Sequence, residues 1–133
     1  MIDSSRPMRD IEGIVKKGKF NAKELVEWIE TKDTYKDWAI LCRTNRDKDD
    51  IIETLQYFGI PAITFKQGEI NRAQLNDMMK KDVVKVLTVH SSKGLAWNNV
   101  VLYKLWWGNK TPEEHRINYV AMTRARDLLI RYS

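Results

Sequence analysis

Short apolar runs alternate with stretches of helical periodicity along most of this chain, and this alternation constrains the fold more than any other feature. Residues 38–42 and 83–89 are compact, largely apolar runs of strand length, and the second is rich in β-branched side chains. Between them, residues 47–58 carry apolar side chains at helical spacing. Parallel strands need a crossover of this kind. The sequence therefore predicts an α/β fold with a mainly parallel sheet flanked by helices.

The other expected elements extend the same pattern. Further strands are expected at 62–65, 99–105 and 127–132, and further helices at 23–29, 71–81 and from 111 to about 124. Gly59 and Pro61 are expected to end the helix at 47–58, and Thr111 is expected to cap the last helix. A chain of 133 residues suits one domain. We expect residues 37–133 to form its core and residues 1–36 a flanking segment with a helix.

Composition narrows the class of protein and its partners. Hydrophobic residues make up 43% of the chain and charged residues 31%, which is typical of a soluble globular protein. No apolar run approaches the roughly 20 residues that span a bilayer, and the first ten residues are polar, so we expect a cytoplasmic protein without a membrane partner. The net charge of +5 suits a nucleic acid or nucleotide, and equally a plain soluble domain.

Metal chemistry has little support in the sequence. Cys42 is the only cysteine, and the two histidines, His90 and His115, lie far apart. No metal site is therefore expected. A self-contained nuclease or phosphatase is also disfavoured, because no clustered carboxylates or metal-ligand spacing could support it.

The segment GIVKKGKF at residues 13–20 is a near match to a phosphate-binding P-loop. Phe20 stands where the motif needs a Ser or Thr hydroxyl to ligate magnesium, and the residues before the segment are mostly polar. We interpret it as a basic surface turn.

Three other segments combine cationic or polar residues with expected strand ends, where ligands of parallel sheets bind. They are AILCRTN at 39–45, VLTVHSSKGLAW at 86–97 and EEHRINYVAMTRAR at 113–126. On the expected last helix, Arg124 lies near the apolar face, so it should meet a carboxylate of the sheet or a phosphate. Spacing alone favours a structural role for His90, while Lys93 and Gly94 could approach a phosphate closely.

Taken together and in this order, the three segments resemble the fourth, fifth and sixth motifs of the UvrD/Rep family of superfamily 1 helicases. The resemblance covers roughly residues 37–133. It implies the second of two RecA-like motor domains, with a three-layer fold. ATP and Mg²⁺ would be held mainly by a separate N-terminal P-loop domain, and single-stranded DNA would be the other partner. The residues of the last two motifs favour the branch of the family that moves 3′ to 5′ along single-stranded DNA.

The resemblance also assigns roles to single residues. Arg124 matches the arginine finger that reaches the γ-phosphate, and we expect it to be the catalytic contribution of this chain. Tyr119 matches a tyrosine expected to be mainly structural, with coupling between the sites as a second role. The remaining assignments are nucleotide contacts at Arg43, Lys93 and Gly94, and DNA contacts at Thr88, His90 and Ser91.

The chain departs from the family pattern at three places. Ala96 stands where a ribose-binding Glu is usual, and Cys42 where a base-stacking Tyr is common. Only about 17 residues separate Phe65 from Val83, so the large inserted domain of the family is absent. Without a P-loop, the chain alone should hydrolyse no ATP. The alternative is a stand-alone, non-catalytic module that binds nucleic acid or protein.

Overall fold

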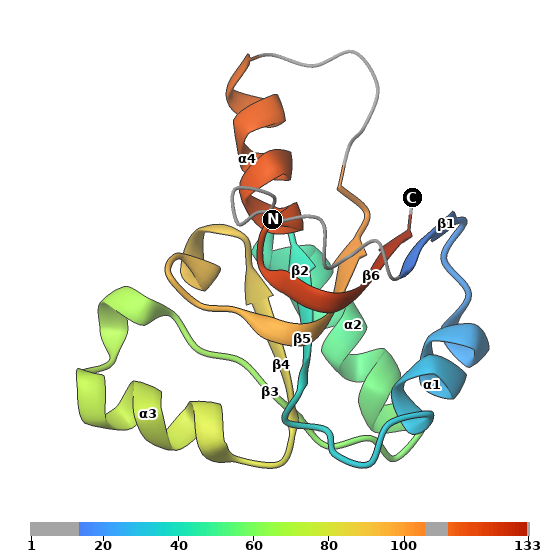
Figure 1. Ribbon diagram of the computed structural model, residues 1–133. Helices are drawn as coiled ribbons and strands as arrows, with labels where there is room; N and C mark the ends of the chain where they lie inside the picture. Colours follow the sequence, from blue (N-terminus) through green and yellow to red (C-terminus); the bar gives the residue numbers. More distant parts are fainter. Residues whose placement is uncertain (1–13, 106–111, 133) are drawn as a thin grey trace.

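The computed structural model describes residues 14–105 and 112–132, and its centre is a six-stranded sheet (Figure 1). The strand order is β1-β6-β5-β2-β4-β3, and all of these neighbours pair in parallel. The strands are β1 (Ile14–Gly18), β2 (Trp38–Cys42), β3 (Ala62–Ile63), β4 (Val84–Thr88), β5 (Trp97–Tyr103) and β6 (Ala125–Tyr132). The predicted α/β class with a parallel sheet is confirmed.

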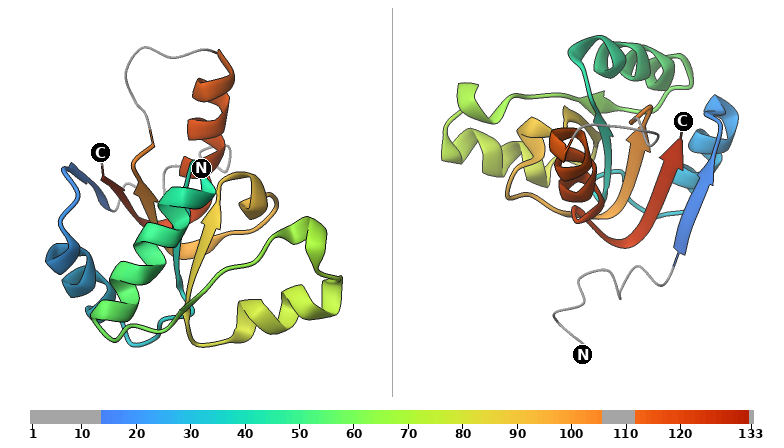
Figure 2. Two further views of the ribbon diagram at one scale, coloured as in Figure 1. Left: turned by 180° about the vertical axis from the view of Figure 1, so that it is seen from behind. Right: turned by 90° about the horizontal axis from the view of Figure 1, so that it is seen from above.

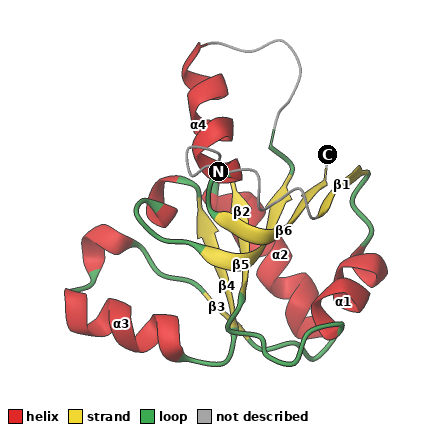
Figure 3. Ribbon diagram, viewed as in Figure 1, coloured by secondary structure: helices red, strands yellow, loops and turns green. Residues whose placement is uncertain are grey.

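Helices cover both faces of this sheet, which gives the predicted three layers (Figures 2 and 3). The helices are α1 (Ala22–Glu30), α2 (Asn45–Tyr57), α3 (Arg72–Lys80) and α4 (Pro112–Met122), with short 3-10 turns η2 (Gln67–Glu69) and η3 (His90–Ser92). Side chains of α1 and α2 pack on one face, and those of α3 and α4 pack on the other.

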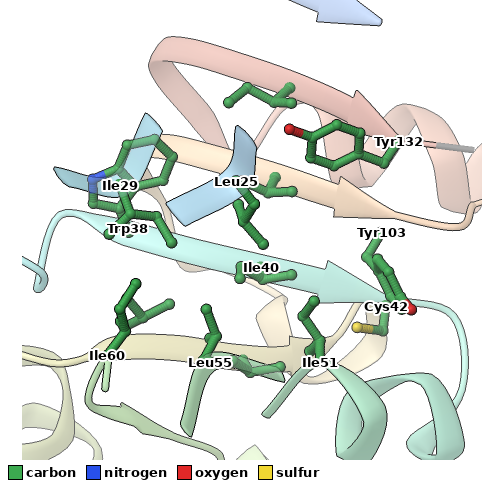
Figure 4. Packing of buried hydrophobic residues seen from close by; sticks show 14 of the residues in the cluster. Leu25, Ile29, Trp38, Ile40, Cys42, Ile51, Leu55, Ile60, Tyr103 and Tyr132 are labelled. Carbon is green, nitrogen blue, oxygen red and sulfur yellow. The ribbon is translucent and has the colours of Figure 1, made fainter. Parts of the chain in front are cut away.

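Alternation along β2 shows how one strand serves both faces. Trp38, Ile40 and Cys42 pack against α1 and α2 (Figure 4), whereas Ala39 and Leu41 belong to the cluster on the opposite face. All five side chains are fully buried. A strand that is buried on both faces has an almost continuous apolar sequence. The position of β2 could therefore be predicted correctly from the sequence.

Local signals set the helix ends. The side chain of Thr44 caps α2 by accepting a hydrogen bond from the backbone N–H of Asp47 at 3.2 Å. Asn71 and Gln74 form a reciprocal capping box at the start of α3. Gly59 adopts a φ of 78° just after α2, as its expected role in ending that helix requires.

The N-terminal part of the chain was predicted wrongly in one respect. The segment interpreted as a basic surface turn is the edge strand β1, which pairs with β6 from Ile14↔Leu128 to Gly18↔Tyr132. Two lysines interrupt its short apolar run, and lysine is common on edge strands. Residues 1–36 are therefore more than a flanking segment, because part of them completes the core sheet. The strand conformation of Ile14–Gly18 agrees with the rejection of a P-loop at this segment.

Several boundaries also differ from expectation. Strand β5 begins at Trp97, two residues early, because it already pairs there with Ala125. Strand β3 has only two residues. Helix α4 ends at Met122, so Arg124 lies in the turn before β6 rather than on the helix. The predicted cap Thr111 falls outside the described residues. No helix within the described ranges is long and apolar enough to cross a membrane.

Candidate functional site

The connection from β4 to β5 is a folded turn with its own hydrogen bonds. The hydroxyl of Thr88 accepts a hydrogen bond from the backbone N–H of Ser91 at 3.4 Å, and the buried hydroxyl of Ser92 donates to the carbonyl of Val89 at 2.6 Å. Gly94 has a φ of 77°, in the left-handed region that other residues rarely adopt. These features hold residues 90–94 in a defined shape.

A side chain from another part of the chain fastens this turn. The amide Nε2 of Gln67, in η2, donates to the backbone carbonyls of Ser91 and Lys93, at 2.9 and 2.5 Å. Sequence reasoning missed Gln67, because nothing local to it indicates a partner 24 residues away. The shape of the turn therefore depends on η2 as well as on its own residues.

An open hollow of about 320 Å³ lies between this turn and α4. Its lining is rich in cations and contains one carboxylate among the described residues. The lining residues are Val89, His90, Lys93, Glu113, Arg116, Val120 and Arg124. Of these, Glu113 and Arg116 were given no role from the sequence, although they lie within the third segment. A hollow with this charge suits an anionic ligand.

Arg124 is the most unusual group in the hollow. Its backbone is fixed, because its N–H donates to the carbonyl of Ala121 at 3.2 Å and its own carbonyl accepts from Trp97 at 2.9 Å. Its Nε is buried and has no hydrogen-bond partner among the described residues. Partial burial lowers the pKa of the guanidinium. Among the described residues no carboxylate of the sheet partners Arg124, whereas an incoming anion would satisfy this group.

The structure brings some of the predicted residues together and separates others. Lys93, His90 and Arg124 line one hollow, although His90 was assigned to DNA and the other two to the nucleotide. Arg43 and Thr88 are half-buried and do not line it.

Tyr119 is 61% exposed, so its ring is not a packing residue of the described core. Its mainly structural role and its second role in coupling both stay predictions.

A second open groove, of about 490 Å³, lies on the other side of the same turn. Gly94 lines this groove and not the first hollow, whereas Lys93 lines both. The rest of its wall comes from Leu95 and from residues of η2, α3 and the link between them. The turn at residues 90–94 is thus a partition between two concave surfaces.

Cys42 cannot take the place of a base-stacking residue. It is fully buried and packs on the face of the sheet covered by α1 and α2, opposite the face that carries the hollow. Burial also raises the pKa of its thiol, with nearby Asp47 adding to the effect, so the group stays neutral.

Other ligand types find less support. No group of three or more potential metal ligands occurs within residues 14–105 and 112–132. A further hollow at α1 is lined by Glu24 and Glu27, whose charges would repel a phosphate. The surfaces beside the β4–β5 connection are therefore the candidate site.

A comparison with protein families gives one match. The model of the UvrD-like helicase C-terminal domain matches residues 65–132, which is half of the chain. This range includes the whole candidate site. No curated protein sequence matches the chain significantly.

Solved structures share the fold at low sequence identity. The C-terminal domain of a possible DNA helicase from Lactobacillus plantarum superposes with a TM-score of 0.68 at 14% identity, covering 98% of this chain and 85% of that one. The C-terminal domain of the DEAD-box protein Dbp5 gives 0.64 at 15% identity, covering 92% and 78%. Arterivirus nonstructural protein 10, a helicase solved with DNA, gives 0.60 at 9% identity, covering 97% of this chain and 31% of that one. At such identities the similarity establishes the RecA-like fold alone.

Proposed function

The chain belongs to the UvrD-like helicase C-terminal domain family, and on that premise we propose that it is the second motor domain of an ATP-dependent DNA helicase. A separate P-loop motor domain would hold ATP and Mg²⁺ and would close against this chain. Single-stranded DNA would be the second partner, with movement 3′ to 5′ as the sequence resemblance implies. Residues 1–133 would act as one unit, a compact version in which η2 and α3 stand in place of a large insert.

One observation carries the proposal, namely that Arg124 lies at the wall of a cationic hollow with its Nε buried and without a hydrogen-bond partner among the described residues. A charge of this kind is stabilised when an anion enters, and most of all when negative charge grows during phosphoryl transfer. Lys93 shares the wall and would assist with the same charge. We assign Arg124 as the arginine finger acting on ATP that is bound by the partner domain.

Further contacts follow from the same arrangement. Arg43 would meet a phosphate from the end of β2, and Gly94 would allow close backbone approach. Thr88, His90 and Ser91 would contact the DNA backbone, and the exposed ring of Tyr119 would couple the two domains.

The test is steady-state ATPase activity of this chain fused to the matching P-loop domain. We expect Arg124→Ala to lower turnover by about 10³-fold or more, the usual cost of losing an arginine finger. Arg124→Lys should recover little, because an ammonium lacks the planar fork. The matched control is Arg126→Ala, since Arg126 is exposed, lies in the same segment and does not line the hollow. Equal activity of the Arg124→Ala and Arg126→Ala proteins would refute the assignment.

A second candidate function is favoured by Cys42 and Ala96. Cys42 is buried away from the hollow, and neither side chain can replace the base and ribose contacts that the family pattern supplies. The chain would then be a non-catalytic module that binds nucleic acid or protein. The fused protein separates the two functions, because such a module would show no DNA-stimulated turnover while still binding its partner.

A further inference from the structure

The end of α2 carries an aromatic pair that the core does not use. Tyr57 is 84% exposed and Phe58 is 36% exposed, and their rings meet edge to face with centroids 5.1 Å apart. Single apolar side chains are common on protein surfaces, whereas adjacent ones mark contact sites. Among the described residues only three large hydrophobic side chains are exposed, and two of them form this pair. The pair is therefore a candidate anchor for a partner.

The backbone that carries the aromatic pair is fixed. The N–H groups of Phe58, Gly59 and Ile60 all donate to carbonyls in the last turn of α2, at 2.9 to 3.3 Å. Gly59 takes the left-handed conformation that closes the helix in this way. The two rings are thus presented on a preformed surface, so a partner would bind them at little cost in conformational entropy.

The outward side of α2, away from the sheet, is acidic. Residues 49–65 contain three carboxylates and no cation, although the chain has a net charge of +5. These carboxylates, Asp49, Asp50 and Glu53, are all exposed. Asp49, Glu53 and Tyr57 follow one another at four-residue spacing, so they form one row along the helix, in which the two like charges repel. No basic residue in the last turn offsets the negative end of the helix dipole. Cations placed along the row would relieve both effects.

Helix α1 covers the same face of the sheet and has similar chemistry (Figure 2). The hollow at α1 is lined by the carboxylates of Glu24 and Glu27, together with Trp28 and Thr31. The indole of Trp28 is half-buried, and indole rings attract ammonium and guanidinium groups. Both helices of this face therefore combine carboxylates with aromatic rings, and both surfaces suit a cationic partner.

We propose that the outward side of α2 binds a basic segment of another protein. An apolar side chain of that segment would cover the aromatic pair, and its cations would face Asp49 and Glu53. A helix with lysines or arginines at four-residue spacing matches this row. Nucleic acid does not fit, because the carboxylates would repel its phosphates. A symmetric contact with a second copy of this chain does not fit either, because it would set the two acidic rows against each other.

The experiment measures binding of a fluorescent synthetic helix to the full chain by anisotropy. The helix is made of leucine and lysine, with the lysines at four-residue spacing. We expect Tyr57→Ser to weaken binding about tenfold, as the loss of an aromatic anchor does. Glu53→Lys should weaken it about fivefold, because a repulsion replaces the attraction of a surface ion pair. The matched controls are Tyr57→Phe, which keeps the ring, and Asp77→Lys, at an exposed carboxylate of α3 on the other face.

The outcomes decide the assignment independently of the proposed function. If Tyr57→Ser and Glu53→Lys weaken binding and their controls do not, the basic segment binds along α2. If all four variants bind the helix equally, or if the wild type binds it no better than a helix with glutamate in place of lysine, the assignment is wrong.

Sedimentation velocity of the free chain tests the remaining occupant. We expect a monomer. An oligomer that Tyr57→Ser dissociates would overturn the inference, because a second copy of this chain would then occupy the surface. None of these results depends on the ATP turnover of the fused protein, which Tyr57→Ser should leave unchanged.

Discussion

The two faces of the sheet are covered in different ways. On one face, α1 and α2 each bury two apolar side chains completely, and Tyr132 adds a hydrogen bond of 2.7 Å to Glu24 of α1. On the other face, α3 buries no residue fully, and the hollow and the groove lie between its helices and the β4–β5 turn.

This difference indicates a division of labour between the faces. Close packing under α1 and α2 supplies stability, and the one described hollow at α1 is lined by the carboxylates of Glu24 and Glu27. The looser cover on the opposite face leaves polar and cationic side chains available, as binding requires. Substitutions on the first face should therefore change stability, and those on the second should mainly change binding.

The largest expected effect on stability comes from the α2 side. Leu55→Ala would empty a fully buried position between α2 and the sheet (Figure 4) and should lower the free energy of unfolding by about 2–5 kcal/mol. Leu75→Ala, at a half-buried position of α3 on the other face, should cost clearly less. Urea denaturation of both variants measures the comparison, and equal losses would contradict it.

A smaller effect is expected from the one lysine buried in the centre of the sheet. Lys85 in β4 is fully buried, and its ammonium donates to the carbonyls of Met79 and Lys81 at 3.2 and 2.6 Å, at the end of α3. Burial lowers its pKa from 10.5 to about 8, although the charges of Asp82 and Asp37 act in the opposite direction. Between these two values the unfolded chain binds more protons than the folded one.

The sign of the pH dependence follows from that proton difference. Stability should rise from pH 7.5 to 9.5, by at most about 2 kcal/mol from this group, because the folded amine is already neutral where the unfolded one is still charged. Urea denaturation at both pH values should show the rise in the wild type and not in Lys85→Met. If the free energy of unfolding rose equally in the wild type and in Lys85→Met, the pH dependence would come from other titratable groups.

Much of the fold could be predicted, for reasons that individual elements make clear. Strand β2 and the helix after it were located closely, because a doubly buried strand is a continuous apolar run and Gly59 marks a helix end. Strand β1 was missed because an edge strand needs no such run. The end of α4 was placed too late, since periodicity does not show where a chain leaves a helix for a strand.

The candidate site was predicted less completely. Two cations of the hollow, Lys93 and Arg124, were assigned roles from the resemblance, whereas Arg116 was not. The groove could not be predicted, because Gln67 and Arg72 become its wall only through contacts between segments distant in the sequence. Those contacts are properties of the folded chain rather than of any local pattern.

The smallest expected change tests whether Gln67 shapes the partition between the hollow and the groove. Gln67→Leu keeps a side chain of similar size but removes both hydrogen bonds to the turn. The change should cost about 1 kcal/mol, because Ser91 is only half-buried and Lys93 is exposed, so water can reach both carbonyls. The effect should be local. The amides of Ser92 and Leu95, which donate to Val89 and Ser92 within the turn, should exchange faster with deuterium than in the wild type.

Gln56→Leu is the matched control, since Gln56 is exposed on α2 at the other face. It should leave exchange in the turn unchanged, and neither variant should alter the amides of β2. If Gln67→Leu also left the turn unchanged, the turn would owe its shape to its own hydrogen bonds alone. Gln67 would then not shape the turn. The comparison between a face held by apolar packing and a face shaped by a polar side chain would be contradicted at this residue.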